Sequence, residues 1–291
     1  MVELTLRSVI HGSSSGVLIL LAVSSYAQQL IDPDFKSVVE RPAYPMNGPT
    51  VAIDEAHSNF HTARGQYRPF ADVLRSDGYK VLASTGKFMP DTLPGVDVLI
   101  IANAYAPSGP AFTEQECDTV RDWVREGGSL LLIADHTPYG TSAENMGDRF
   151  GVTMGKGWVF DRSPLGNGFT SQLVFSRENG LLGVHPLLRG RDASENVTHV
   201  RSFSGQSLGV PQGATVLLRL SLTAREASDA RDADAGDPGG TKSVSVAGGA
   251  QGIARCSARA GLSYSAKPQC SPRRSCRCSN RTVRRGSSRR A

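Results

Sequence analysis

Between residues 50 and 150, short apolar segments alternate with amphipathic ones. The two strongest apolar runs, Val96–Ala102 and Ser129–Ala134, predict strands that are buried on both faces of a parallel sheet. Weaker runs predict strands at Thr50–Ile53 and Tyr79–Ala83. Apolar residues at helical spacing predict helices at Arg68–Asp77 and Ser142–Phe150. A further helix is predicted between a capping box, formed by Thr113 and Glu116, and Gly127. This alternation indicates an α/β fold with a doubly wound, mostly parallel sheet.

Polar and ionisable side chains gather where three of these strands end. The carboxyl ends of parallel strands share one edge of a sheet, and ligands of open α/β sheets bind outside that edge. We therefore expect one crevice to be lined by Asp54, Glu55, His57 and His61 after the first strand, Asn103 and Tyr105 after the third, and Asp135, His136 and Thr137 after the fourth.

Beyond Gly151 the pattern is less regular. Strands are expected at Trp158–Phe160, Leu173–Phe175, Val197–Phe203 and Ala214–Leu220, with turns rich in Gly and Asn between them. His185 lies in a turn, and Ser204–Ser207 follows a strand, so His185 and Gln206 are further candidates for ligand binding at the crevice.

Charge and composition divide the chain into a lead-in, a body and a tail. Twelve of the 32 Lys and Arg residues and none of the 27 acidic ones lie at 238–291, so the preceding residues carry 20 basic and 27 acidic groups. An acidic body gives no electrostatic case for nucleic-acid binding. We expect a signal peptide at 1–27, an extended lead-in at 28–49, the α/β domain at 50–227 and a disordered basic tail at 228–291.

The signal-peptide prediction rests on Arg7, an apolar run at Gly16–Val23, and small residues at Ser25 and Ala27 before a cut. The run is too short for an uncleaved membrane anchor. We therefore expect an extracytoplasmic protein, periplasmic or secreted, that is free of the membrane after cleavage. Its oligomeric state is not indicated by the sequence.

The tail is rich in Arg, Ser, Cys and Pro. An RNA-binding tail and a zinc knot on Cys276 and Cys278 are possible interpretations, but the cysteine spacing does not suit zinc. A frameshift near Cys256 explains the composition of the tail better, because residues 262–273 can be rewritten in another reading frame as an apolar strand that runs into a helix. We therefore interpret the C-terminus as frameshifted.

Four segments together resemble a family. VAIDEAHSNFHT, YRPFADVLRSDGYKV, VDVLIIAN and FTEQECDTVRDWVREGGSLLLIADHTPYG are similar to uncharacterised bacterial members of the class I glutamine amidotransferase-like superfamily, over about residues 49–225. The resemblance implies a flavodoxin-like sheet and, in true amidotransferases, a cysteine at the elbow after the strand that matches Ser129–Ala134. That elbow reads Ala134-Asp135-His136-Thr137, and Cys117 lies on the apolar face of a helix. Amidotransfer is therefore not implied.

The candidate residues permit two kinds of chemistry and one structural alternative. His57, His61, Asp135 and His136 could hold a divalent metal, with the two earlier histidines spaced for one helical turn. A His oriented by Asp54 or Glu55 could instead act as a general base on water. Alternatively, these groups satisfy one another through hydrogen bonds.

Two functions follow: an exported domain that binds a small polar ligand, such as a sugar or cell-wall fragment, without turning it over, or a hydrolase that uses the same residues. We favour the binding domain because the family's nucleophile is absent. A third possibility is a degenerate gene product that does not fold stably.

Overall fold

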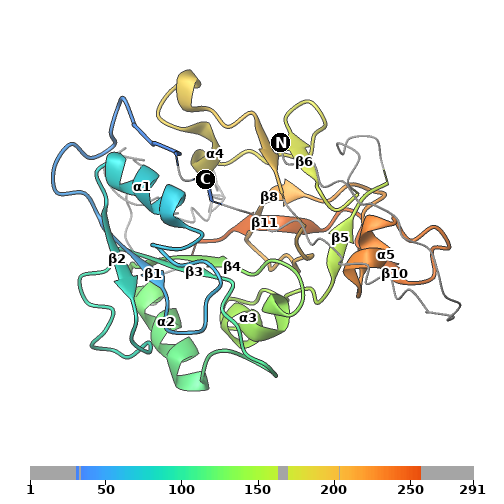
Figure 1. Ribbon diagram of the computed structural model, residues 1–291, viewed down its shortest axis with the longest axis horizontal. Coiled ribbons are helices and arrows are strands. Elements are labelled where there is room, and N and C mark those ends of the chain that lie inside the picture. The colour runs from blue at the N-terminus through green and yellow to red at the C-terminus, as the bar shows by residue number, and fades with distance from the viewer. Residues whose placement is uncertain (1–30, 33, 163–169, 203, 257–291) are drawn as a thin grey trace, which may run out of the picture.

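The computed structural model describes residues 31–32, 34–162, 170–202 and 204–256 of the 291-residue chain. Its centre is a parallel four-stranded sheet in the order β2-β1-β3-β4 (Figure 1). The strands are β1 (Thr50–Asp54), β2 (Lys80–Ser84), β3 (Val98–Ala102) and β4 (Ser129–Ile133). The predicted α/β class with a parallel sheet is thus confirmed.

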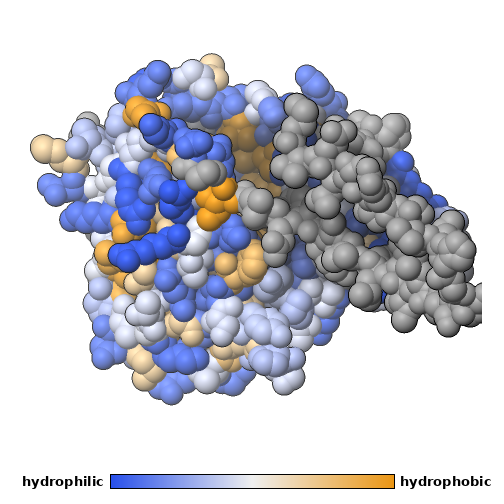
Figure 2. All heavy atoms as spheres, viewed as in Figure 1, coloured by the Kyte–Doolittle hydropathy of each residue, from blue (hydrophilic) through white to orange (hydrophobic). Residues whose placement is uncertain are grey.

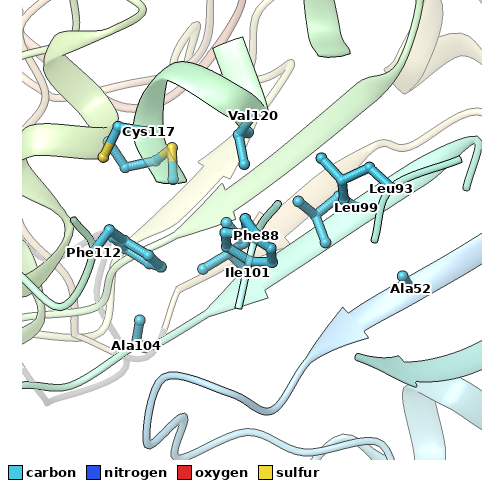
Figure 3. Close-up of a cluster of buried hydrophobic side chains, with 10 residues drawn as sticks. Ala52, Phe88, Leu93, Leu99, Ile101, Ala104, Phe112, Cys117 and Val120 are labelled. Atoms are coloured by element: carbon cyan, nitrogen blue, oxygen red, sulfur yellow. The ribbon is translucent and has the colours of Figure 1, made fainter. Parts of the chain in front are cut away.

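Alternate residues of the sheet pack against different helices. Val51, Ile53 and Ile100 share a cluster with α1 (Arg68–Ser76), whose Ala71 is fully buried. Ala52, Leu99 and Ile101 share another with α2 (Glu114–Glu126), as Figure 3 shows for Cys117 and Val120 of that helix. Because successive side chains of a strand point to opposite faces, α1 and α2 cover opposite faces of the sheet.

Local sequence signals explain how α2 begins and ends. The predicted capping box is present, since the Thr113 side chain accepts from the Glu116 backbone and the Glu116 side chain accepts from the Thr113 backbone. Gly127 ends the helix at φ 121°, a conformation that favours glycine. The next helix, α3 (Tyr139–Asp148), begins three residues before the predicted start at Ser142, so it follows the β4 elbow almost directly.

The second half of the chain builds short antiparallel sheets beside this core (Figure 1). One contains β5 (Trp158–Phe160), β9 (Arg225–Ala227) and β10 (Ser243–Ser245). The other two pair β8 (Thr215–Arg219) with β11 (Ala250–Ala254), and β6 (Val174–Ser176) with β7 (His199–Arg201). The described part of this half also contains three short helices: α4 (Pro186–Arg189), the 3-10 helix η1 (Ala193–Glu195) and α5 (Ala230–Asp234).

The prediction of a disordered tail from residue 228 is wrong for residues 228–256. Asp229 accepts from the Arg231 backbone and caps α5, whose Ala233 is fully buried. The strand β11 pairs with β8, and its Ala250 is also fully buried. Side-chain caps and strand pairing therefore order a segment whose composition is rich in Asp, Ala and Gly. The supposed frameshifted residues 257–291 lie outside the described residues, as does the signal-peptide segment.

On the face drawn in Figure 2, the described surface is mostly hydrophilic with separate apolar spots. Among the helices that the structure describes, none has the length and apolar character needed to span a bilayer.

Candidate functional site

The imidazole of His57 is enclosed between two carboxylates. Its Nδ1 lies 2.9 Å from Oδ2 of Asp54, the last residue of β1, and its Nε2 lies 2.8 Å from Oε1 of Glu116 in the first turn of α2. All three side chains are almost completely inaccessible to solvent. The rings of Phe88 and Phe112 pack against the imidazole with centroid separations of 4.7 and 4.6 Å.

This arrangement favours a charged imidazolium. Burial lowers the pKa of His57, but the hydrogen bonds and charges of Asp54 and Glu116 outweigh burial and raise the pKa above its usual value. Burial similarly raises the pKa of Glu116, whereas hydrogen bonds from Thr113 and His57 lower it to about 2. Both ring nitrogens of His57 are used, so His57 serves to join β1 to α2 and has no free nitrogen for a substrate or a metal.

Glu116 is the partner that sequence reasoning missed. The capping box accounted for its Oε2, which accepts from the Thr113 backbone and hydroxyl. Its Oε1 accepts from His57 and, at 3.3 Å, from the Phe88 backbone. A glutamate on the buried side of an amphipathic helix was the available signal, because carboxylates are seldom buried without a partner.

The other residues after β1 have separate surroundings. Residues 55–62 form no helix, so His57 and His61 do not share a helical face as expected. Glu55 accepts from the Ala63 backbone at 2.8 Å. The His61 ring packs on Tyr67 at a centroid separation of 4.5 Å, and burial lowers the pKa of His61. Its buried Nδ1 has no hydrogen-bond partner among the residues that the structure describes.

Asp135 and His136 occupy the elbow after β4. The Ser204 hydroxyl donates to Asp135 Oδ1 at 3.2 Å, and His136 Nε2 lies 3.8 Å from Asp135 Oδ2. The side chains of Asp135 and His136 are 26% and 21% exposed, so this pair is reachable from solvent, unlike His57. The ring of His136 stacks on Trp158 with centroids 3.3 Å apart and planes 14° apart.

The tautomer of neutral His136 is set by the backbone. Its Nδ1 lies 2.7 Å from the carbonyl oxygen of Thr137, which can only accept. Nδ1 therefore carries the hydrogen, and Nε2 presents a lone pair toward Asp135. Thr137 thus contributes through its carbonyl group, in contrast to the side-chain role expected from the sequence.

The charge of Asp135 affects the pKa of two tyrosines. Burial is the larger cause of the raised pKa of both Tyr67 and Tyr139, and the negative charge of Asp135 adds to it. Burial also raises the pKa of Asp135 itself, against the opposing effects of His136 and Ser204. The phenols therefore stand within electrostatic reach of this carboxyl group.

Asn103 connects the two segments that were expected to face each other. Its side-chain oxygen accepts from the Asp135 backbone at 2.9 Å, and its carbonyl accepts from the Phe60 backbone at 3.2 Å. Asn103 is buried and adopts a φ of 48°, which asparagine tolerates better than most residues. Asn103 thus bridges the segments after β1 and β4, with its side chain bound to one and its main-chain carbonyl bound to the other.

The three remaining candidates have different surroundings. Tyr105 is 41% exposed after β3. His185 caps α4, where its Nδ1 accepts from Leu187. Gln206 is 2% exposed and donates to the Met154 sulfur at 3.5 Å, while its Oε1 has no partner. We define the elbow site as Asp135, His136, Ser204, Tyr67 and Tyr139; of these, sequence reasoning selected the first two.

The four-residue metal set is not assembled in this arrangement. Within the described ranges, no group of three or more His, Cys, Asp or Glu side chains is positioned to hold an ion. Both nitrogens of His57 already contact carboxylates, and His61 packs against Phe60 and Tyr67.

Comparisons with known proteins give no close relative. No family model matches the sequence, and no curated protein matches it. Solved structures with some similarity include the mmIFT52 N-terminal domain, with a TM-score of 0.48, 17% identity and coverage of 60% of this chain and 74% of that one. A ThuA-like protein from Bacteroides uniformis has a TM-score of 0.32, 16% identity and coverage of 64% and 71%. A beta-galactosidase from Bifidobacterium adolescentis has a TM-score of 0.25, 12% identity and coverage of 72% and 92%. At these TM-scores the likenesses establish neither family nor activity.

Proposed function

We propose that this protein binds a small polar ligand, a sugar or cell-wall fragment, at the elbow site. The observation that carries the proposal is the partly exposed carboxyl group of Asp135, which contacts the Ser204 hydroxyl and faces the free Nε2 of His136. These groups lie at the carboxyl edge of the parallel sheet, where open α/β folds bind ligands.

The chemistry of the elbow site suits a ligand with several hydroxyl groups. A carboxylate and the Nε2 lone pair accept hydrogen bonds, whereas Ser204 and the two tyrosines can both donate and accept. The rings of Tyr67 and Tyr139 add apolar faces against which the C–H surface of a sugar ring can pack. A few polar groups among aromatic side chains are typical of small-molecule sites.

Binding without amidotransfer is the favoured form of this proposal. The elbow carries Asp135 in place of the nucleophilic cysteine of the resembled superfamily. Cys117 is fully buried on the core face of α2, and burial raises the pKa of its thiol to about 12. A thiol with that pKa is protonated at neutral pH and is a poor nucleophile.

Hydrolysis is a second candidate because of one observation. His136 Nε2 is held as an acceptor by the bond from Nδ1 to Thr137, and it lies beside a carboxyl group at a partly exposed position. A water molecule between Nε2 and a bound ligand would be placed for general-base catalysis. The stacked Trp158 would fix the orientation of this base.

We further propose that the domain is a flavodoxin-like, bacterial relative of the class I glutamine amidotransferase-like proteins and that it is exported. The order β2-β1-β3-β4, with α1 and α2 on opposite faces, supports the first point. The second rests on the sequence of residues 1–27. Fractionation of cells that express the tagged full chain tests export, and retention in the cytoplasm with residues 1–27 uncleaved would contradict it.

The function is tested by calorimetric titration of the full chain with glucose, glucosamine and N-acetylglucosamine, followed by a hydrolysis assay on aryl glycosides and amides. Ligand-binding function predicts saturable heat with at least one sugar, its loss in His136→Ala, and no turnover. Turnover that requires His136 would favour the hydrolase. Absence of both binding and turnover in a cooperatively folded sample would contradict both candidates.

A further inference from the structure

Among the described residues, Asp135 forms no ion pair with a lysine or an arginine. Among the ion pairs of the described residues, its only basic neighbour is His136, whose Nε2 lies 3.8 Å from Oδ2. That separation is beyond hydrogen-bond distance. The closest polar contact of the carboxyl group is the neutral hydroxyl of Ser204, at 3.2 Å. Asp135 therefore retains acceptor capacity that the described part of the chain does not use.

His136 is held away from a closer approach. Its Nδ1 donates to the Thr137 carbonyl at 2.7 Å, and its ring lies flat on Trp158. Rotation of the imidazole toward Asp135 would disturb the hydrogen bond and the stacking together. The gap between these two side chains is thus a feature of the folded elbow.

Two fully buried carboxylates at this edge of the sheet have a closer basic partner than Asp135 has. Asp54 and Glu116 contact the two ring nitrogens of His57 at 2.9 and 2.8 Å, so a cation within the protein compensates them. Among the described residues, the one basic group beside the partly exposed Asp135 is the His136 imidazole, which stays 3.8 Å from Oδ2. A ligand that supplies a positive charge would complete the same arrangement at Asp135.

Two tyrosines lie within electrostatic reach of Asp135. The charge of Asp135 is felt by the phenols of Tyr67 and Tyr139, and the His136 ring contacts Tyr139 at a centroid separation of 5.7 Å. The faces of aromatic rings attract cations, most strongly where water is partly excluded. An anionic ligand would instead meet an uncompensated carboxylate.

We infer that the ligand of the elbow site carries a protonated amine, which pairs with Asp135, and that an amino sugar is its chemical class. This inference rests on the proposed binding function and narrows it, because neutral and acidic sugars then become poor ligands. Ser204 donates to Oδ1 of Asp135, and the ammonium group binds Oδ2.

The test compares glucosamine, glucose and N-acetylglucosamine as probes of the full chain by calorimetry at about pH 6, where an aliphatic amine is protonated. These sugars differ at one position. Glucosamine is expected to bind at least about tenfold more tightly than the two neutral sugars. This advantage should shrink as the salt concentration rises, because exposed charges are screened, while any binding of glucose should not change.

Asp135→Asn is the matched variant, since it removes the charge and keeps the shape. It should abolish the preference for glucosamine. Asp148→Asn, at the opposite end of the ten-residue helix α3 and on the surface, should leave the preference unchanged. Circular dichroism checks that each variant is folded, and the salt series on the unaltered chain remains decisive if Asp135→Asn does not fold.

The outcomes separate the two proposals. Equal binding of all three sugars, or a preference that survives in Asp135→Asn, would overturn the amine inference and leave the binding function standing. Failure of all three sugars to bind would count against the binding function itself. Preference for glucosamine that depends on both Asp135 and low salt supports the inference.

Discussion

His57 Nε2 lies 2.8 Å from Glu116 Oε1, in a position where neither side chain reaches solvent. This contact joins the carboxyl end of β1 to the N-terminus of α2, which are 59 residues apart in sequence. His57, which the sequence placed among the catalytic candidates, therefore forms a buried structural contact at the edge of the sheet. The more accessible chemistry lies at the elbow after β4.

Substitution Glu116→Gln should destabilise the fold strongly. It leaves the His57 imidazolium with one carboxylate. It also puts an NH2 donor in place of one of two acceptor oxygens, of which Oε1 serves His57 and Phe88 and Oε2 serves Thr113. Breaking a buried charge pair in this way costs about 3 kcal/mol of unfolding free energy, measured by urea denaturation. Glu178→Gln, at an exposed position, is the control and should change stability by less than about 0.5 kcal/mol. Equal effects of the two substitutions would contradict the role of the pair.

The contribution of His57 should depend on pH in a defined direction. Its pKa is raised on folding, so the stability that it adds is complete below its unfolded pKa of about 6.5 and is lost as the pH rises through the folded value. Glu116 has its pKa lowered to about 2, so its contribution is complete above about 4.5 and is lost toward pH 2. The stability difference between the unaltered chain and His57→Asn should therefore be greatest between about pH 4.5 and 6.5. If the stability difference between the two proteins is constant from about pH 4 to 9, protonation of His57 does not contribute to stability.

Asp135→Asn should keep or increase stability while weakening ligand binding. Burial raises the pKa of Asp135, which means that its ionised form is less favourable in the folded state than in the unfolded state. Removing the charge should raise the unfolding free energy at neutral pH by up to about 1 kcal/mol. Thermal denaturation at pH 7 measures this. A large loss of stability would indicate that Asp135 has a structural role like that of Asp54.

Residues beyond 228 should contribute to stability. Ala250 is fully buried in β11, opposite Arg219 of β8, whereas Val244 of β10 is 64% exposed. Ala250→Asp should cost about 3 kcal/mol or more, because it takes a carboxylate out of water at a fully buried position, and Val244→Asp should cost less than about 1 kcal/mol. Chemical denaturation compares the two. Tolerance of Ala250→Asp would support the disordered tail expected from composition.

Patterns of apolar residues were sufficient for the parallel sheet. The runs Val96–Ala102 and Ser129–Ala134 correctly predicted strands, and the capping box at Thr113 fixes where α2 begins. Burial on both faces was wrong for the second run, because β4 is the last strand of the sheet and its Leu131 is 43% exposed. The short antiparallel strands carried less information. In β11 the residues are Ala, Gln, Gly, Ile and Ala, and their pairing with β8 arises from tertiary contacts that no local pattern reveals.

The elbow site was predicted in part for a similar reason. The chain position of Asp135 and His136 after a buried strand placed them at the sheet edge. Tyr67 precedes α1 and Trp158 lies in β5, so their approach to the elbow depends on how distant segments fold together. The prediction that His57 and His61 point the same way was wrong because it required a helical turn. In the structure, the Asn59 side chain accepts from the His57 backbone in a non-helical turn.

The most direct test of the elbow site is a two-dimensional ¹H–¹⁵N NMR titration of the full chain with glucosamine. Binding at the site predicts saturable shifts for the amides of Asp135, His136 and Ser204 and for the side chain of Trp158, and these shifts should be absent in Asp135→Asn. Saturable shifts confined to other parts of the molecule, with these signals unmoved, would contradict the account.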